Sequence, residues 1–282
     1  MKVACTVWSR GKSGDYLKGL PIAIAKKVTK DGKILSKYSY DSFGNRSSKS
    51  WGDDHQVTYQ YNALNQLISS KDHAGTQQRY AYDKRGNLTE VFRNENLVIQ
   101  HQYGALNRVE KTWNFEQNLG AMYKYNGFGK RVGKTEGTSL KPILSDSGLE
   151  HMTLNPTKQV EDVLDLTRTF NDLLTRKKDG NATNYTWEFD ILSSSGVDGD
   201  YNYFLDDLGS PMRLVDGRGV EYDVFAFDEF GSSLEEPNPN HFNPFAFTGY
   251  RNDDIVLAGT YYAQAREYEP AIGRFTAQDT LD

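Results

Sequence analysis

Cysteine and histidine are scarce in this sequence. Of its 282 residues only Cys5 is a cysteine, which excludes an internal disulfide and a zinc site made of several thiolates. The five histidines are scattered, and no two of them have the spacing of metal ligands. They are therefore expected to be surface or packing residues, and the sequence predicts no metal and no other cofactor.

The chain also has no excess of positive charge and no long apolar run. Its 33 basic and 38 acidic residues leave a net charge of −5, which argues against a nucleic-acid partner, because such binders need a basic surface. No stretch is long and apolar enough to span a membrane. Residues 1–25 lack the apolar run and cleavage site of a signal peptide. If the protein is exported, the usual signal is not in this chain.

Tyrosine is abundant, with 18 copies, and five of them begin a recurring phrase. An aromatic residue is followed by a small residue, two variable positions, and then Gly or Asn. The copies begin at Tyr40, Tyr61, Tyr82, Tyr103 and Tyr125, so they recur every 21 or 22 residues. A fixed period in this range indicates an array of one supersecondary unit.

Each copy predicts a strand, a tight turn and a return strand, as in Tyr82-Asp83-Lys84-Arg85-Gly86-Asn87-Leu88. Asp or Asn after the Tyr initiates a turn, and Gly or Asn three residues later tolerates a left-handed backbone. A second aromatic stands two residues before the key Tyr in four copies, with His101 in the other, so the two side chains share one strand face. This ladder has two interpretations: a packed core face, or a platform for stacking sugars.

The rest of the chain divides around these copies. Residues 1–30 resemble a degenerate repeat or the cut end of a longer array, with a hairpin turn at Asp31-Gly32. Residues 31–135 hold the five repeats, and residues 136–200 are predicted to be an irregular connecting segment. Within that segment, 159–166 fits either a helix or a strand by periodicity. Residues 201–282 form the last part.

The repeats resemble the YD repeats of Rhs proteins, and the last part resembles the Rhs repeat-associated core. The core-like phrases are Tyr203 to Pro211, Phe227 to Gly231 and Gly273-Arg274-Phe275 to Asp279. The segment 165–174 is similar to one that Rhs chains carry before the core, which favours strands at 159–166. The resemblance implies an all-β fold of antiparallel YD-repeat hairpins in a coiling sheet, a segment of an Rhs-type β-shell.

The function implied by this resemblance is the shell and delivery part of an Rhs polymorphic toxin used in bacterial competition. The expected partners are the protein's own C-terminal toxin domain, absent from this chain, and the rest of the repeat array. The expected location is secreted or cell-surface, as part of a larger protein. One alternative is a cell-surface module that binds carbohydrate or another partner, and a second is a self-cleaving core.

Candidate catalytic residues for self-cleavage are Arg266, Glu267 and Asp279. The resemblance implies an aspartic-type autoprotease that acts on its own C-terminal extension, with the two carboxylates sharing a proton and Arg266 in support. Glu267 stands where many cleaving members have Asp, Thr280 replaces the usual Pro, and the chain ends before the expected cut. The competing interpretation is that Arg266 pairs with a carboxylate to fasten the last strand.

Overall fold

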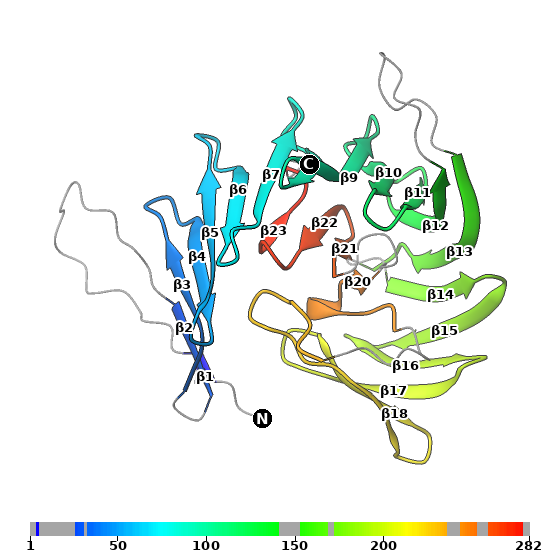
Figure 1. The fold of residues 1–282 in the computed structure, drawn as a ribbon. Coiled ribbons are helices and arrows are strands. Elements are labelled where there is room, and N and C mark those ends of the chain that lie inside the picture. Colours follow the sequence, from blue (N-terminus) through cyan, green and yellow to red (C-terminus); the bar gives the residue numbers. More distant parts are fainter. Residues whose placement is uncertain are drawn as a thin grey trace. The chain divides into compact units, whose positions relative to one another are not determined.

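The computed structural model describes residues 4–5, 26–30, 33–140, 153–168, 172–235, 243–252 and 259–278. In these ranges the regular elements are β-strands, apart from the 3-10 turn η1 (Phe247–Gly249) (Figure 1). All pairings between neighbouring strands in these ranges are antiparallel, so the all-β prediction is confirmed. The chain forms two compact units, residues 1–82 with 90–98, and residues 83–89 with 99–282. Among the described residues, no helix has the length and apolar character to cross a bilayer.

The first unit is built from hairpins joined end to end. Each strand pairs with the next along the chain, and β2–β3 is the hairpin predicted around Asp31-Gly32. Its strands are β1 (Ala4–Cys5), β2 (Lys26–Lys30), β3 (Lys33–Tyr40), β4 (Arg46–Trp51), β5 (His55–Tyr61), β6 (Leu67–Asp72) and β7 (Gln77–Tyr82). The residues of β8 (Leu88–Arg93) and β9 (Asn96–Tyr103) are divided between the two units.

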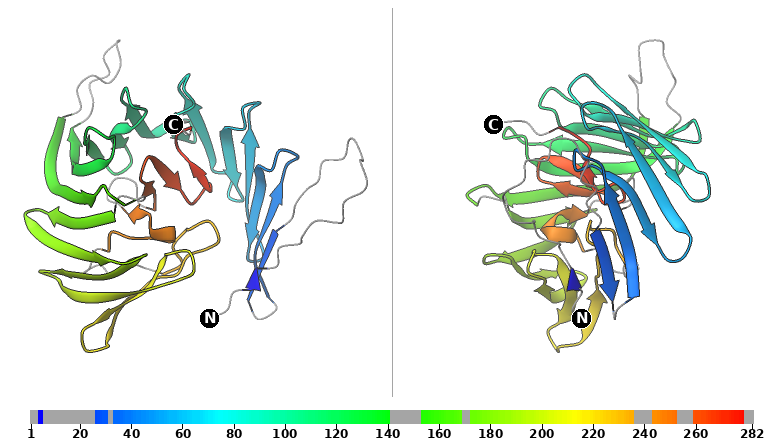
Figure 2. Two further views of the ribbon diagram at one scale, coloured as in Figure 1. Left: turned by 180° about the vertical axis from the view of Figure 1, so that it is seen from behind. Right: turned by 90° about the vertical axis from the view of Figure 1, so that its left-hand side faces the viewer.

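The second unit contains two sheets. The outer sheet, which pairs strand by strand in chain order, comprises the end of β9 with β10 (Val109–Asn114), β11 (Leu119–Tyr125), β12 (Arg131–Leu140), β13 (Thr153–Asp165), β14 (Asp172–Lys178), β15 (Asn181–Trp187), β16 (Ile191–Gly196), β17 (Gly199–Leu205), β18 (Pro211–Asp216) and β19 (Glu221–Val224). The tail sheet comprises β20 (Arg251–Asn252), β21 (Tyr261–Ala263), β22 (Arg266–Glu269) and β23 (Arg274–Phe275). Within this unit, the tail sheet lies on the concave side of the outer sheet (Figures 1 and 2).

The repeat turns are held by the residue that follows the key Tyr. The Oδ1 atom of Asp83 accepts hydrogen bonds from the N–H groups of Arg85 and Asn87, at 2.8 and 2.9 Å. Gly86 then adopts a φ of 81°, which side chains disfavour. The same carboxylate or amide role is played in other turns by Asp41, Asn62, Asn126, Asp206, Asp216 and Asp228. The predicted turn mechanism is therefore confirmed.

The aromatic ladder faces inward. Tyr38, Tyr59 and Tyr80 are buried, with at most 8% of each side chain exposed. The key tyrosines donate their hydroxyls to backbone carbonyls of the preceding repeat, as in Tyr61 to Arg46 at 2.8 Å and Tyr125 to Val109 at 2.7 Å. The ladder is thus a packed face tied together by hydrogen bonds, and the three buried rings are not accessible to a sugar.

Residues 159–165 of the connecting segment belong to the long strand β13, as the strand interpretation predicts, and Leu166 begins the turn that follows it. A register shift between Val163 and Leu164 interrupts its pairing with β14, which explains the mixed periodicity of the sequence. The predicted boundaries at 135 and 200 fall inside β12 and β17. The four-part division itself stays a prediction, and most of residues 1–30 lie outside the described ranges.

Candidate functional site

The two described residues of the predicted tail site lie side by side on β22 but point to opposite faces. Glu267 is 4% exposed and faces the outer sheet. Arg266 is half-buried, and its guanidinium lies over the ring of Phe275 at 3.8 Å. Successive residues of a strand alternate in this way. Asp279 lies outside the described residues, so its predicted role with Glu267 stays a prediction.

Glu267 is paired with an arginine that the sequence analysis did not single out. Arg131 Nη1 donates to Glu267 Oε1 at 2.8 Å, and both side chains are at most 5% exposed. The Arg131 guanidinium also lies 3.6 Å from the ring centroid of Tyr262. The backbone N–H of Arg131 donates to the Tyr262 hydroxyl at 3.2 Å. This buried contact joins β12 of the outer sheet to β21 and β22 of the tail sheet.

A second ion pair joins the two sheets, with the positive and negative partners exchanged between them. Here the cation, Arg251, comes from the tail sheet and donates to Asp162 of β13 at 2.8 Å. Asp162 also accepts two hydrogen bonds from Arg176, both at 2.8 Å. Arg251 further donates to the carbonyl oxygen of Arg131 at 3.2 Å. Each sheet thus supplies one arginine and one carboxylate to the contact.

A third buried group of charges lies on the outer sheet. Lys134 of β12 donates to Glu136 at 2.6 Å, and Lys158 of β13 approaches the same carboxylate at 3.4 Å. All three side chains are at most 7% exposed. A buried charge is tolerated only when it is paired, so these contacts fix the register of β12 on β13.

The two tail-contact carboxyl groups differ in their electrostatics. Burial raises the pKa of Glu267 against the opposing effect of Arg131 and Lys134. Burial would also raise the pKa of Asp162, but Arg176 and Arg251 outweigh it and hold that pKa below its ordinary value. Glu267 is therefore the carboxyl group that more readily accepts a proton. Aspartic-type acid–base chemistry would need such a group together with a second carboxylate.

The buried role of Arg131 could have been predicted from its position in the repeat. It is the first strand residue after the turn of the fifth copy, and this position is buried in every copy. The five occupants are Arg46, Leu67, Leu88, Val109 and Arg131. An arginine at a position that sister repeats fill with Leu or Val requires a buried counter-ion, although the repeat does not show which acidic residue supplies it.

The last described residues also dock on the repeats of the second unit. The N–H of Leu88 donates to the carbonyl oxygen of Thr276 at 2.7 Å. The Tyr103 hydroxyl donates to the same oxygen at 3.3 Å, whereas other key tyrosines donate to a backbone carbonyl of the preceding repeat. At this position the tail therefore supplies the acceptor that a preceding repeat supplies elsewhere. In the described ranges, no three His, Cys, Asp or Glu side chains are grouped so as to bind a metal ion.

Comparison with known proteins gives a family match to the RHS repeat at residues 61–93. The chain is 25% identical over 272 residues to the tRNA3(Ser)-specific nuclease WapA of Bacillus spizizenii, covering 91% of the chain. The tRNA nuclease WapA of Bacillus subtilis strain 168 is likewise 25% identical over 275 residues, covering 91% of the chain. The chain spans only 10% of each of these relatives.

Among solved structures, a TcdB2–TccC3 complex matches with a TM-score of 0.44 and 15% sequence identity. The match covers 92% of this chain and 16% of the other.

The hairpins, the turn chemistry and the repeat match define an all-β protein built from YD repeats. The chain carries an RHS repeat at residues 61–93 and is similar to the WapA nucleases over 91% of its length. Proteins that carry this repeat are extracellular or cell-surface proteins.

Proposed function

We propose that this chain is a structural and delivery part of an Rhs toxin, in which repeat strands help to enclose and present a C-terminal effector. The RHS repeat match and the similarity to WapA nucleases support a toxin-associated role. The chain corresponds to a tenth of the length of those nucleases, so their nuclease activity is not attributed to it. Its partners in this proposal are the effector and the rest of the repeat array.

The observation that carries the proposal is the docking of the tail sheet on the concave side of the outer sheet. Two buried ion pairs, Arg131–Glu267 and Asp162–Arg251, hold it there. Thr276 continues this contact through Leu88 and Tyr103. A segment that follows β23 would begin on the concave side of the outer sheet, which is the side that an enclosed effector has to reach. The proposed location is secreted or cell-surface, within a larger protein.

Limited proteolysis of the full-length natural protein tests enclosure. If the repeats enclose the effector, a protease that cleaves the isolated effector within minutes should leave it intact in the full protein. An Arg131→Leu variant, which weakens tail docking, should expose the effector faster than wild type. An Arg213→Leu variant, which removes an exposed ion pair with Glu221, is the matched control. Equal cleavage of enclosed and isolated effector would reject the proposal.

A second candidate function is aspartic-type self-cleavage. The observation that favours it is Glu267, a carboxyl group whose burial raises its pKa and so favours the protonated form that an acid–base pair requires. The roles of Asp279 and Arg266 follow from the family resemblance alone. In the structure, the guanidinium that bonds Glu267 belongs to Arg131.

Self-cleavage is tested by expressing the chain with the natural residues that follow it and looking for a cut on a gel. Glu267→Gln and Asp279→Asn should each abolish the cut, while Asp200→Asn, on the exposed side of β17, should leave it unchanged. A cut that survives Asp279→Asn would exclude the assigned pair.

A further inference from the structure

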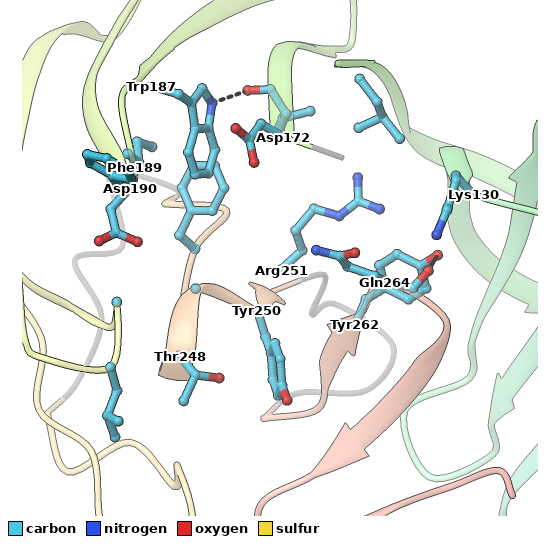
Figure 3. Close-up of a pocket in the computed structure, with 17 residues that line it drawn as sticks. Lys130, Asp172, Trp187, Phe189, Asp190, Thr248, Tyr250, Arg251, Tyr262 and Gln264 are labelled. Carbon is cyan, nitrogen blue, oxygen red and sulfur yellow. Dashed lines mark hydrogen bonds between the residues drawn. The ribbon is translucent and has the colours of Figure 1, made fainter. Parts of the chain in front are cut away.

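A cavity of about 310 Å³ lies in the second unit between the outer sheet and the tail sheet (Figure 3). Trp187 and Phe189 line it from the β15–β16 hairpin, and Thr248 lines it from η1. More than half of the residues that line it are aliphatic or aromatic. Arg131 and Glu267 are not among them, so the cavity is separate from the predicted tail site.

Phe189 stands at the mouth of this cavity and is almost fully exposed. Its exposed fraction of 93% is the highest among the large apolar residues that the structure describes. It lies in the tight turn between β15 and β16, which is closed by a hydrogen bond from the N–H of Glu188 to the carbonyl oxygen of Asp190 at 3.0 Å. That bond is made by the backbone, so the turn itself does not require an aromatic side chain at its tip.

Leu208 extends the apolar surface at the mouth. It is 62% exposed and lines the same cavity from the turn between β17 and β18. The two turns are adjacent, because the Oδ1 atom of Asp190 lies only 3.4 Å from the position that a Cβ atom on Gly209 would take. Phe189 and Leu208 therefore form one exposed apolar patch beside a cavity. Contiguous patches, unlike single exposed apolar residues, mark interaction surfaces.

The wall of the cavity is held in place before any partner binds. The Nε1 atom of Trp187 donates a hydrogen bond to the carbonyl oxygen of Leu173 at 2.7 Å, which Figure 3 shows as a dashed line. The indole also makes an edge-on contact with Phe245 at a centroid distance of 5.3 Å. A cavity of about 150 Å³ already holds a benzene molecule, so this one has room for a phenyl ring.

Two charged side chains at the mouth have opposite signs and make no hydrogen bond or ion pair within the described parts of the chain. They are Asp190 and Lys130. Figure 3 shows them on opposite sides of the cavity. The other two charged residues of the lining, Arg251 and Asp172, already form ion pairs. The mouth thus suits a partner that presents an apolar ring together with one charge of each sign.

A second copy of this chain has that chemistry. In a two-fold symmetric dimer the same patch of both copies meets, so every contact occurs twice with the roles exchanged. A two-fold axis that crosses the mouth midway between Asp190 and Lys130 exchanges the two sides of the mouth. Asp190 of each copy then faces the partner's Lys130, and Phe189 of each copy faces the partner's cavity.

We propose that this face binds a second copy of the chain, with the Phe189 ring of each copy inserted into the partner's cavity and Asp190 paired with the partner's Lys130. The apolar centre of the contact is Phe189 and Leu208 from each copy, which is small beside a standard interface of about 800 Å² per partner. The dimer is therefore weak and dissociates on dilution. It depends on neither enclosure of an effector nor self-cleavage, so it can fail independently of both.

Sedimentation of the 282-residue chain tests the dimer. Its average mass should rise from monomer towards dimer between about 5 and 500 µM, the range for a weak contact. Phe189→Ser should weaken association about a hundredfold or more, because the dimer loses two buried rings. Phe128→Ser is the matched control, since Phe128 is 77% exposed at another turn tip of this unit, and it should associate like the wild type. A monomer throughout this range would overturn the proposal, as would a dimer that Phe189→Ser leaves unchanged.

An exchange of charges then locates the contact. Asp190→Lys and Lys130→Glu should each weaken association about tenfold, because each places like charges opposite one another. The double variant restores opposite charges and should recover the wild-type affinity, which a purely structural role of either residue would not produce. Asp200→Lys, at an exposed position of β17, is the control and should leave the affinity unchanged. A double variant that associates no better than the single ones would reject this arrangement of the two copies.

Discussion

Arg131 and Glu267 are 136 positions apart in the sequence, yet they form a buried ion pair at 2.8 Å that joins the outer sheet to the tail sheet. Asp162 and Arg251 repeat the contact with the charges exchanged between the sheets. Because neither charge of such a pair tolerates burial alone, this arrangement makes tail docking specific. The tail cannot shift by a residue without leaving buried charges unpaired.

Removal of one partner of this pair should be strongly destabilising. Arg131→Leu places at this position the residue found in the second and third repeats, Leu67 and Leu88, but it leaves the Glu267 carboxylate buried without its partner. We expect a loss of about 3–5 kcal/mol in the free energy of unfolding, measured by urea denaturation. The double variant Arg131→Leu with Glu267→Met should recover most of this loss, because it removes both charges.

The exposed pair Arg213–Glu221 provides the control, since both side chains are about half exposed or more. Arg213→Leu should cost less than about 1 kcal/mol. If the effects of Arg131→Leu and Glu267→Met were simply additive, the two side chains would not be coupled and the interpretation of the pair would be wrong.

Acid sensitivity should arise in part from His101. This side chain is buried and bonds to Thr112 at 2.9 Å, and burial lowers its pKa from 6.5 to about 4. The unfolded chain therefore binds more protons than the folded chain between pH 4 and 6.5, so stability is lost as the pH falls through this window. At pH 5 the loss from His101 should be about 2 kcal/mol.

A His101→Gln variant tests this effect, because glutamine is neutral at every pH and can still bond to Thr112. The difference in unfolding free energy between pH 7 and pH 5 should be smaller in the variant than in the wild type. The exposed residue His73 is the control, and His73→Gln should leave the difference unchanged. An identical pH dependence in the wild type and His101→Gln would refute the assignment.

The local parts of this fold could be predicted from the sequence, and the long-range parts could not. The turn at Asp83 and Gly86 depends on residues within one copy, so its chemistry is visible in the repeat. Strand alternation also shows that Arg266 and Glu267 face opposite sides, which argues against their joint action. The partnership of Arg131 with Glu267 depends on how the tail sheet docks, and no local period encodes it. The cavity beside Thr248 likewise arises only where two sheets meet.

The turn aspartates should tolerate Asn but not Ala. Asp206 Oδ1 accepts N–H groups from Leu208 and Ser210 at 2.9 and 2.8 Å, and Asn62 makes the equivalent bonds in the second repeat. Asp206→Ala should therefore cost about 1–2 kcal/mol in unfolding free energy, and Asp206→Asn less than about 0.5 kcal/mol. Asp207→Ala, at an exposed position in the same turn, is the control. Equal losses of unfolding free energy in Asp206→Ala and Asp206→Asn would show that the side-chain hydrogen bonds do not stabilise the turn.

The left-handed turn position should discriminate between side chains by backbone strain alone. Gly44 has a φ of 82°, and a Cβ atom added there would meet no atom within 4 Å. Any cost of Gly44→Ala is then conformational, about 1–2 kcal/mol, and thermal unfolding should show it. Gly44→Asn should cost less, because Asn65 and Asn107 occupy this position in sister repeats with φ near 58°.

Gly217, which has equal space but no positive φ, is the control. Gly217→Ala should be neutral or slightly stabilising, so a loss there as large as at Gly44 would exclude strain as the cause.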